Sequence, residues 1–158
     1  MDKNQRKMTV TLFENRQQAD STSNNVANQL AAVQSQIDVA TEQRPLRYGV
    51  EPVTLVAVSK RQPENKIDAA LEAGQRVFGE NRVQEAMQRW TDRRKLYSDL
   101  ILHLIGPLQT NKVADAVALF DVIEVVDRER LARAIAKEMA YQNRFLPCYI
   151  QVNTGEEP

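Results

Sequence analysis

The sequence of 158 residues contains a single cysteine, Cys148, and no long apolar segment. One cysteine cannot form a disulfide within the chain, which fits a reducing cytosol. No apolar run approaches the roughly 18 residues of a transmembrane helix, and the first ten residues lack the apolar core of a signal peptide. We therefore expect a cytoplasmic protein that does not bind a membrane.

The sequence also has no excess of charge of either sign, because 21 basic residues balance 21 acidic residues. A chain with a formal net charge of zero has no overall field that would attract nucleic acid or an anionic lipid surface. Its length is sufficient for one domain with a substantial core and too short to expect two. We therefore expect one domain that does not bind nucleic acid.

The N-terminal part divides into two segments of different character. Residues 1–23 are rich in Gln, Asn, Ser and Thr and are predicted to be a polar, loosely ordered extension. From residue 24 onward the apolar residues follow one another at steps of three and four, as at Val26, Leu30, Val33 and Ile37. This spacing predicts an amphipathic helix with one buried stripe, ending near Thr41, at the start of a domain that spans residues 24–158.

Five short apolar segments follow, and helical patterns separate them. The predicted strands are 53–58, 76–81, 101–106, 121–126 and 146–152, and the predicted helices are 63–74, 83–90, 111–120 and 128–140. The first strand is almost continuously apolar, which predicts burial on both of its faces. Each connection is long enough to hold a helix, as parallel pairing requires, so the chain repeats a βα unit.

A regular βα repeat belongs to the α/β class, as either an open doubly wound sheet or a closed barrel. A dinucleotide-binding doubly wound sheet should carry GxGxxG after its first strand, whereas SKRQPEN stands there. We therefore predict a TIM-type (β/α) barrel. A complete barrel of eight units takes about 250 residues. The sequence is expected to supply about five of the eight units, with the C-terminal part missing.

Polar residues stand where the predicted strands end, and in βα barrels these positions face the active site. Lys60 directly follows the first strand, and the apolar run Val56–Val58 precedes it. A lysine forms an imine from its neutral amine, which an apolar wall favours. By position alone, an ordinary exposed charge is the commoner explanation of such a lysine.

Three motifs carry a resemblance to a known family. VTLVAVSK, GENRVQEA and HLIGPLQTNK closely resemble, in order and spacing, the YggS/PROSC family of pyridoxal 5'-phosphate (PLP) binding proteins, the PLP homeostasis proteins. The likeness continues through VIEVVDRERLA to YIQVN and so extends from about residue 24 to the end. That family is similar to the barrel domain of alanine racemase, which implies the same barrel here.

The resemblance implies a cofactor site formed by three residues. Lys60 matches the lysine that holds PLP as an internal aldimine, Asn81 matches a contact on the cofactor ring side, and His103 matches a residue that lines the same mouth. Asn81 also stands where an N-cap of the next helix is expected. His103 alternates with leucines and is equally explained as a core histidine whose ring is satisfied. Both alternatives stay open.

The implied function is that of a PLP-binding protein that takes part in PLP homeostasis without independent catalytic turnover. Its partners would be PLP and apo PLP-dependent enzymes that receive the cofactor. A PLP-dependent amino-acid racemase-like enzyme, a Schiff-base aldolase and a non-functional truncated fragment are the alternatives. The family's glycine- and serine-rich phosphate loop and its arginine, from the last third of the barrel, have no counterpart in this sequence.

Four further residues receive structural predictions. Asp127 is placed to cap the helix over residues 128–140. Gly79 and Gly106 allow the backbone to turn sharply or to approach a ligand where a strand ends. Cys148, within the last predicted strand, is expected to be a buried structural thiol.

Overall fold

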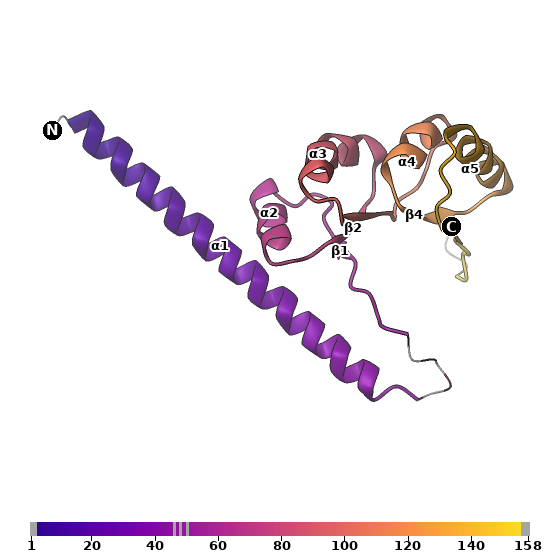
Figure 1. The fold of residues 1–158 in the computed structure, drawn as a ribbon, viewed down its shortest axis with the longest axis horizontal. Helices are drawn as coiled ribbons and strands as arrows, with labels where there is room; N and C mark the ends of the chain where they lie inside the picture. The colour runs from indigo at the N-terminus through magenta and orange to yellow at the C-terminus, as the bar shows by residue number, and fades with distance from the viewer. Residues whose placement is uncertain (1–2, 46, 48, 50, 156–158) are drawn as a thin grey trace. The chain divides into compact units, whose positions relative to one another are not determined.

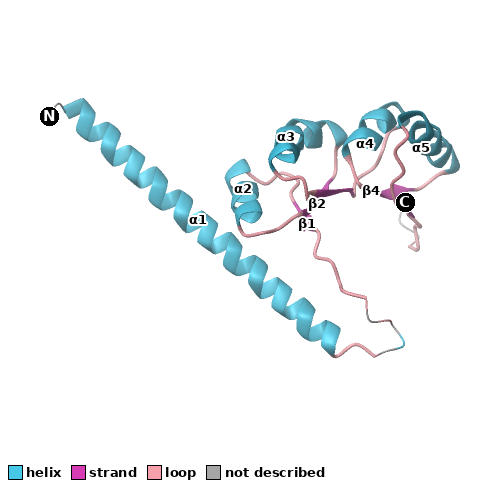
Figure 2. Cartoon of the chain, in the orientation of Figure 1, coloured by secondary structure: helices cyan, strands magenta, loops and turns pink. Residues whose placement is uncertain are grey.

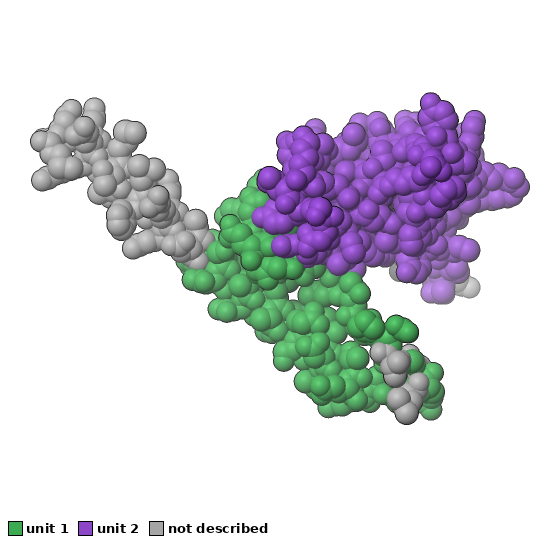
Figure 3. Space-filling view, in the orientation of Figure 1, with its two compact units in different colours: residues 1–55, 61–75 green, residues 56–60, 76–158 purple. Residues whose placement is uncertain are grey.

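The computed structural model describes residues 3–45, 47, 49 and 51–155, and the chain divides into two compact units (Figure 3). Unit 1 comprises Met1–Leu55 and Arg61–Gln75, and unit 2 comprises Val56–Lys60 and Arg76–Pro158. The helices of unit 1 are α1 (Lys3–Glu42) and α2 (Glu64–Glu72). Every strand of the sheet belongs to unit 2.

Helix α1 begins at Lys3, so the prediction of a loosely ordered segment before residue 24 was wrong. Residues 3–23 contain neither proline nor glycine, the two residues that most strongly oppose a helix. The helix packs against α2, where Ser23 Oγ donates to Glu72 Oε2 at 2.9 Å. Val26 and Leu30 are half-buried but Val33 is 42% exposed, so the predicted apolar stripe is only partly covered.

Helix α2 has the termini that the sequence predicted. It begins directly after Pro63, and Gly74 follows its C-terminal end with a φ of +91°, the left-handed conformation that glycine adopts without strain. Ile67, Ala70 and Leu71 form its buried face. Proline before the first turn and glycine after the last one therefore define this helix.

Unit 2 contains one five-stranded sheet in which every pair of neighbours is parallel (Figure 2). The strands are β1 (Ala57–Val58), β2 (Val77–Glu80), β3 (Ile101–Leu104), β4 (Val122–Val126) and β5 (Cys148–Ile150). Their order in the sheet is their order in the chain, as in a barrel, whereas a doubly wound sheet reverses direction. The α/β class and the barrel-type arrangement of five βα units are confirmed.

The connections between the strands of unit 2 carry helices on one side of the sheet (Figure 1). These helices are α3 (Val83–Leu96), α4 (Val113–Leu119) and α5 (Glu129–Gln142), with the 3₁₀ turn η2 (Thr110–Lys112) leading into α4. Side chains alternate along each strand, so one face of the sheet packs on these helices. The buried strand residues on that face include Phe78, Leu102, Leu104, Ile123 and Val125.

The other face of the sheet carries Ile101, His103, Val122 and Glu124 and is less covered, with Ile101 41% exposed. The strands at the two edges are exposed as well, with Val58 at 46% and Ile150 at 79%. The prediction that residues 53–58 are buried on both faces was therefore wrong. The physical reason is that β1 is an edge strand that pairs only with β2.

Cys148 lies in the edge strand β5 and is exposed, so the prediction of a buried thiol was wrong. Its Sγ lies 3.7 Å from the carbonyl oxygen of Leu146. Partial burial nevertheless raises the pKa of the Cys148 thiol above its ordinary value, which disfavours the thiolate. The result argues against a nucleophilic role for this cysteine.

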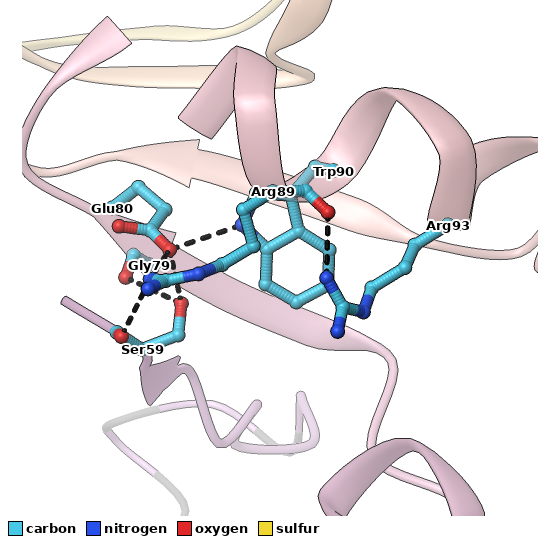
Figure 4. A network of polar contacts seen from close by, with 6 residues as sticks. All are labelled: Ser59, Gly79, Glu80, Arg89, Trp90 and Arg93. Carbon is cyan, nitrogen blue, oxygen red and sulfur yellow. Dashed lines mark hydrogen bonds and ion pairs between the residues drawn. The ribbon is translucent and has the colours of Figure 1, made fainter. Parts of the chain in front are cut away.

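A buried carboxylate joins the ends of β1 and β2 to α3 (Figure 4). Glu80 is fully buried, and its Oε1 accepts from Ser59 Oγ at 2.7 Å, from Arg89 Nη1 at 2.8 Å and from Trp90 Nε1 at 3.0 Å. Arg89 Nη1 also donates to the carbonyl oxygen of Ser59 at 2.9 Å. Ser59, which precedes Lys60, and Glu80, which precedes Asn81, therefore both form hydrogen bonds with side chains of α3.

The segments that follow β2 and β3 approach each other very closely at Gly106. A Cβ built on Gly106 would lie 2.4 Å from the carbonyl oxygen of Asn81, which is far inside van der Waals contact. A Cβ on Gly79 would instead meet Ile105 Cδ1 at 3.0 Å and Val56 Cγ1 at 3.2 Å, both ends of flexible side chains. Gly106 therefore permits a close approach of two backbone segments beside the candidate site.

We predict that Glu80→Ala lowers the free energy of unfolding by roughly 3–5 kcal/mol, because it removes the buried carboxylate that accepts from Ser59, Arg89 and Trp90. Urea denaturation measures the change. Asp92→Ala is the matched control, because this carboxylate pairs with Lys95 on the surface and is 88% exposed. The control should unfold like the wild type, and equal losses in both variants would contradict a special role for the Glu80 network.

We also predict that Gly106→Ala destabilises the chain more than Gly79→Ala. The Cβ on Gly106 meets backbone atoms that move only with their strand, and such overpacking typically costs about 1–3 kcal/mol. The side chains that face Gly79 can rotate away. Comparison of the two thermal unfolding midpoints tests the prediction, and an equal or larger loss for Gly79→Ala would refute it.

Candidate functional site

Lys60 stands at the carboxyl end of β1, as the sequence predicted. The backbone N–H of Ser59 donates to the carbonyl oxygen of Gly79 at 3.0 Å, so pairing with β2 continues to the residue before Lys60. The Ser59 side chain is buried on the helix side with Glu80, and Lys60 follows it at the start of a turn. Lys60 is exposed, and the chain turns directly after it, with Arg61 at a φ of +58°.

The apolar residues near Lys60 come from two strands. Val56 lies over Gly79 on the less covered face of the sheet, next to Ile105, as the short distances to a Cβ built at Gly79 show. Alternation places Val58 on this face too, and it places Ala57 on the other. Of the apolar wall predicted from residues 56–58, Val56 and Val58 therefore remain, and Ile105 is an addition that the sequence did not indicate.

Asn81 is the first residue after β2 and lines an open pocket of about 540 Å³ at the ends of β2 and β3. The other lining residues include Arg82, Gln84, Pro107, Gln109 and Lys112. The N-cap position of α3 is Arg82, and no side chain caps this helix, so the interpretation of Asn81 as its N-cap was wrong. Its side chain is half-buried at the mouth, and the predicted ligand contact stays a prediction.

His103 lies in the middle of β3, where it is in register with Gly79 of β2 and Val122 of β4. Its side chain is 14% exposed, and its Nδ1 lies 2.5 Å from Oε1 of Glu124. The ring is therefore on the sheet face opposite the buried leucines and has a carboxylate partner. Glu124 was not predicted as a site residue, although a charged residue inside the apolar strand VIEVV was a usable signal.

Asp127 does not cap α5, because Arg128 occupies the N-cap position and no side chain caps this helix. The prediction was therefore wrong by one residue, and the Asp127 carboxylate pairs with Arg128 Nη1 instead. Arg128 Nη2 also donates to the carbonyl oxygen of Leu108 at 2.9 Å. This arginine links the segment after β3 to the segment after β4.

The three predicted site residues lie at or near the ends of neighbouring strands, but the pocket that Asn81 lines includes neither Lys60 nor His103. Lys60 and Asn81 follow the neighbouring parallel strands β1 and β2, and His103 lies in the next strand, β3. In the part of the chain that the structure describes, no group of three or more His, Cys, Asp and Glu side chains is placed to hold a metal ion. None of the described helices is both long and apolar enough to cross a bilayer. An amine at this position is suited to covalent chemistry with a carbonyl compound.

Comparison with known proteins shows which family the chain belongs to. The alanine racemase N-terminal domain family matches residues 50–157. The pyridoxal phosphate homeostasis protein of Escherichia coli K12 is 37% identical over 137 residues, which are 85% of this chain and 57% of the relative. The protein of the same name from Vibrio cholerae is 40% identical over 107 residues, or 66% of this chain and 45% of the relative.

Solved structures of proteins from this family are similar to the chain as well. PipY of Synechococcus elongatus PCC7942 with PLP bound is 37% identical and superposes with a TM-score of 0.68, over 84% of this chain and 56% of PipY. PipY without PLP gives a TM-score of 0.71 at 38% identity. The chain spans little more than half the length of these relatives. The predicted resemblance to PLP homeostasis proteins is confirmed, and the chain belongs to the alanine racemase N-terminal domain family.

Proposed function

We propose that this chain binds PLP covalently through Lys60 and takes part in PLP homeostasis without catalytic turnover. The observation that carries the proposal is the position of Lys60 at the carboxyl end of β1, in a chain that is 37% identical to a protein solved with PLP bound. The natural recipients of the cofactor would be apo PLP-dependent enzymes, and the compartment would be the cytoplasm.

The residues at the strand ends fit the chemistry of this cofactor. PLP would supply an aldehyde, and Lys60 would hold the cofactor covalently through its side-chain amine. Lys60 is exposed and therefore within reach of a ligand, and Val56 and Ile105 contribute apolar side chains near the end of its strand. Asn81 would contact the cofactor on its ring side, and His103 would line the same mouth.

A racemase-like enzyme is the second candidate, because one observation favours it. The His103–Glu124 pair lies on the less covered face of the sheet and is a group that can exchange protons. A racemase requires a second proton-transfer group on the opposite side of the cofactor ring as well. The homeostasis function requires only that the lysine holds the cofactor and releases it.

We predict that PLP, trapped by borohydride reduction, labels Lys60 of the 158-residue chain. Peptide mass spectrometry after digestion locates the added mass. Lys60→Ala should lower the label by about tenfold or more, because no other lysine directly follows a strand of the sheet in the described part of the chain. Lys66→Ala, which removes an exposed lysine of α2, is the matched control and should leave the label unchanged.

Two results would count against the proposal. Label spread evenly over surface lysines, with no dependence on Lys60, would show that the chain does not hold PLP at this site. Steady racemisation of alanine by the wild type, at a rate above that of Lys60→Ala, would replace the homeostasis function by the racemase-like one.

A further inference from the structure

The pair formed by His103 and Glu124 is the one close contact between two titratable side chains on the less covered face of the sheet among the described residues. The two residues belong to the adjacent strands β3 and β4, and Nδ1 and Oε1 lie 2.5 Å apart. The side chains are 14% and 35% exposed, so water competes only partly for the contact. The contact therefore joins two partly buried side chains of the sheet and not two mobile surface groups.

The chemistry of the two groups determines which atom donates. An ionised carboxylate only accepts hydrogen bonds, whereas each nitrogen of a neutral imidazole is either a donor or an acceptor. With Glu124 as a carboxylate acceptor, the hydrogen bond between Nδ1 and Oε1 places the proton on Nδ1. In the neutral ring, Nε2 then carries a lone pair and no proton.

Nε2 of His103 is accessible. It makes no hydrogen bond to any described residue, and the buried side-chain nitrogen and oxygen atoms without a partner in that part of the chain are Glu80 Oε2 and Arg94 Nε. Because Nε2 has no hydrogen-bond partner and is not one of these buried atoms, it is exposed to solvent. The ring thus combines a fixed proton on one side with an accessible acceptor on the other.

We propose that Glu124 is a positioning residue that holds the proton of His103 on Nδ1, so that Nε2 accepts a hydrogen bond from a hydroxyl or ammonium group of a ligand bound at Lys60. The assignment of the proton follows from the His103–Glu124 contact alone. The role toward a ligand rests on the proposed function, because that function is what places a ligand at Lys60.

The proton position is measurable because His103 is the only histidine of the chain. The two imidazole nitrogens of the ¹⁵N-labelled chain, recorded at a pH where the ring is neutral, give separate chemical shifts for a protonated and an unprotonated nitrogen. We expect Nδ1 to be protonated and Nε2 unprotonated in the wild type. Glu124→Met removes the acceptor at similar side-chain length, and the two shifts should then approach the average of two exchanging tautomers.

The control and the opposing outcomes are defined by the same spectra. Glu129→Gln changes an exposed carboxylate that pairs with Arg133, and it should reproduce the wild-type shifts. A wild-type spectrum with the proton on Nε2, or with averaged shifts, would overturn the proposal. The wild-type spectrum decides this point even if Glu124→Met does not fold.

Addition of PLP separates this proposal from the proposed function. With Lys60 labelled, we expect the Nε2 shift to move toward that of a hydrogen-bonded nitrogen while Nδ1 stays protonated, and an unchanged Nε2 would overturn the ligand role. Absence of label at Lys60 together with a protonated Nδ1 would refute the proposed function and support the positioning role of Glu124.

Discussion

The buried carboxylate of Glu80 is the interaction on which the rest of the site depends. A fully buried charge is costly unless hydrogen bonds and an opposite charge compensate it, and here Ser59, Arg89 and Trp90 all donate to the same oxygen. These donors come from the end of β1 and from α3. Because the compensation requires all of them in place, the backbone next to Lys60 is held against the backbone next to Asn81.

The division of the sheet into two faces explains why a site forms on one of them. The helix-covered face takes the leucines of β3 and the alternate residues of β4, which build an apolar core. The opposite face therefore receives His103 and Glu124, whose polar atoms would be unsatisfied in that core. The same alternation that stabilises the domain thus gathers the groups that would contact a ligand.

Much of the fold was predictable because hydrophobic periodicity is a local property. All five strands lie within the segments predicted for them, although β1 covers only Ala57–Val58 of the predicted segment 53–58, and Pro63 and Gly74 were correct as the limits of α2. The helix caps were less predictable, because Asp127 and Asn81 each stand one residue before the position that the N-cap occupies. The exposure of Cys148 and of β1 could not be predicted either, since it depends on which strands lie at the sheet edges.

By itself the sequence determined the α/β class, the βα repeat and the place of Lys60 at a strand end, since each of these follows from short-range patterns and from motifs of fixed spacing. Only the tertiary structure decided that Glu124 meets His103, that Glu80 joins β1 to α3, and that Gly106 faces the backbone of Asn81. These contacts join residues 10 to 25 positions apart in the chain. Their formation depends on the register of neighbouring strands, which no local pattern specifies.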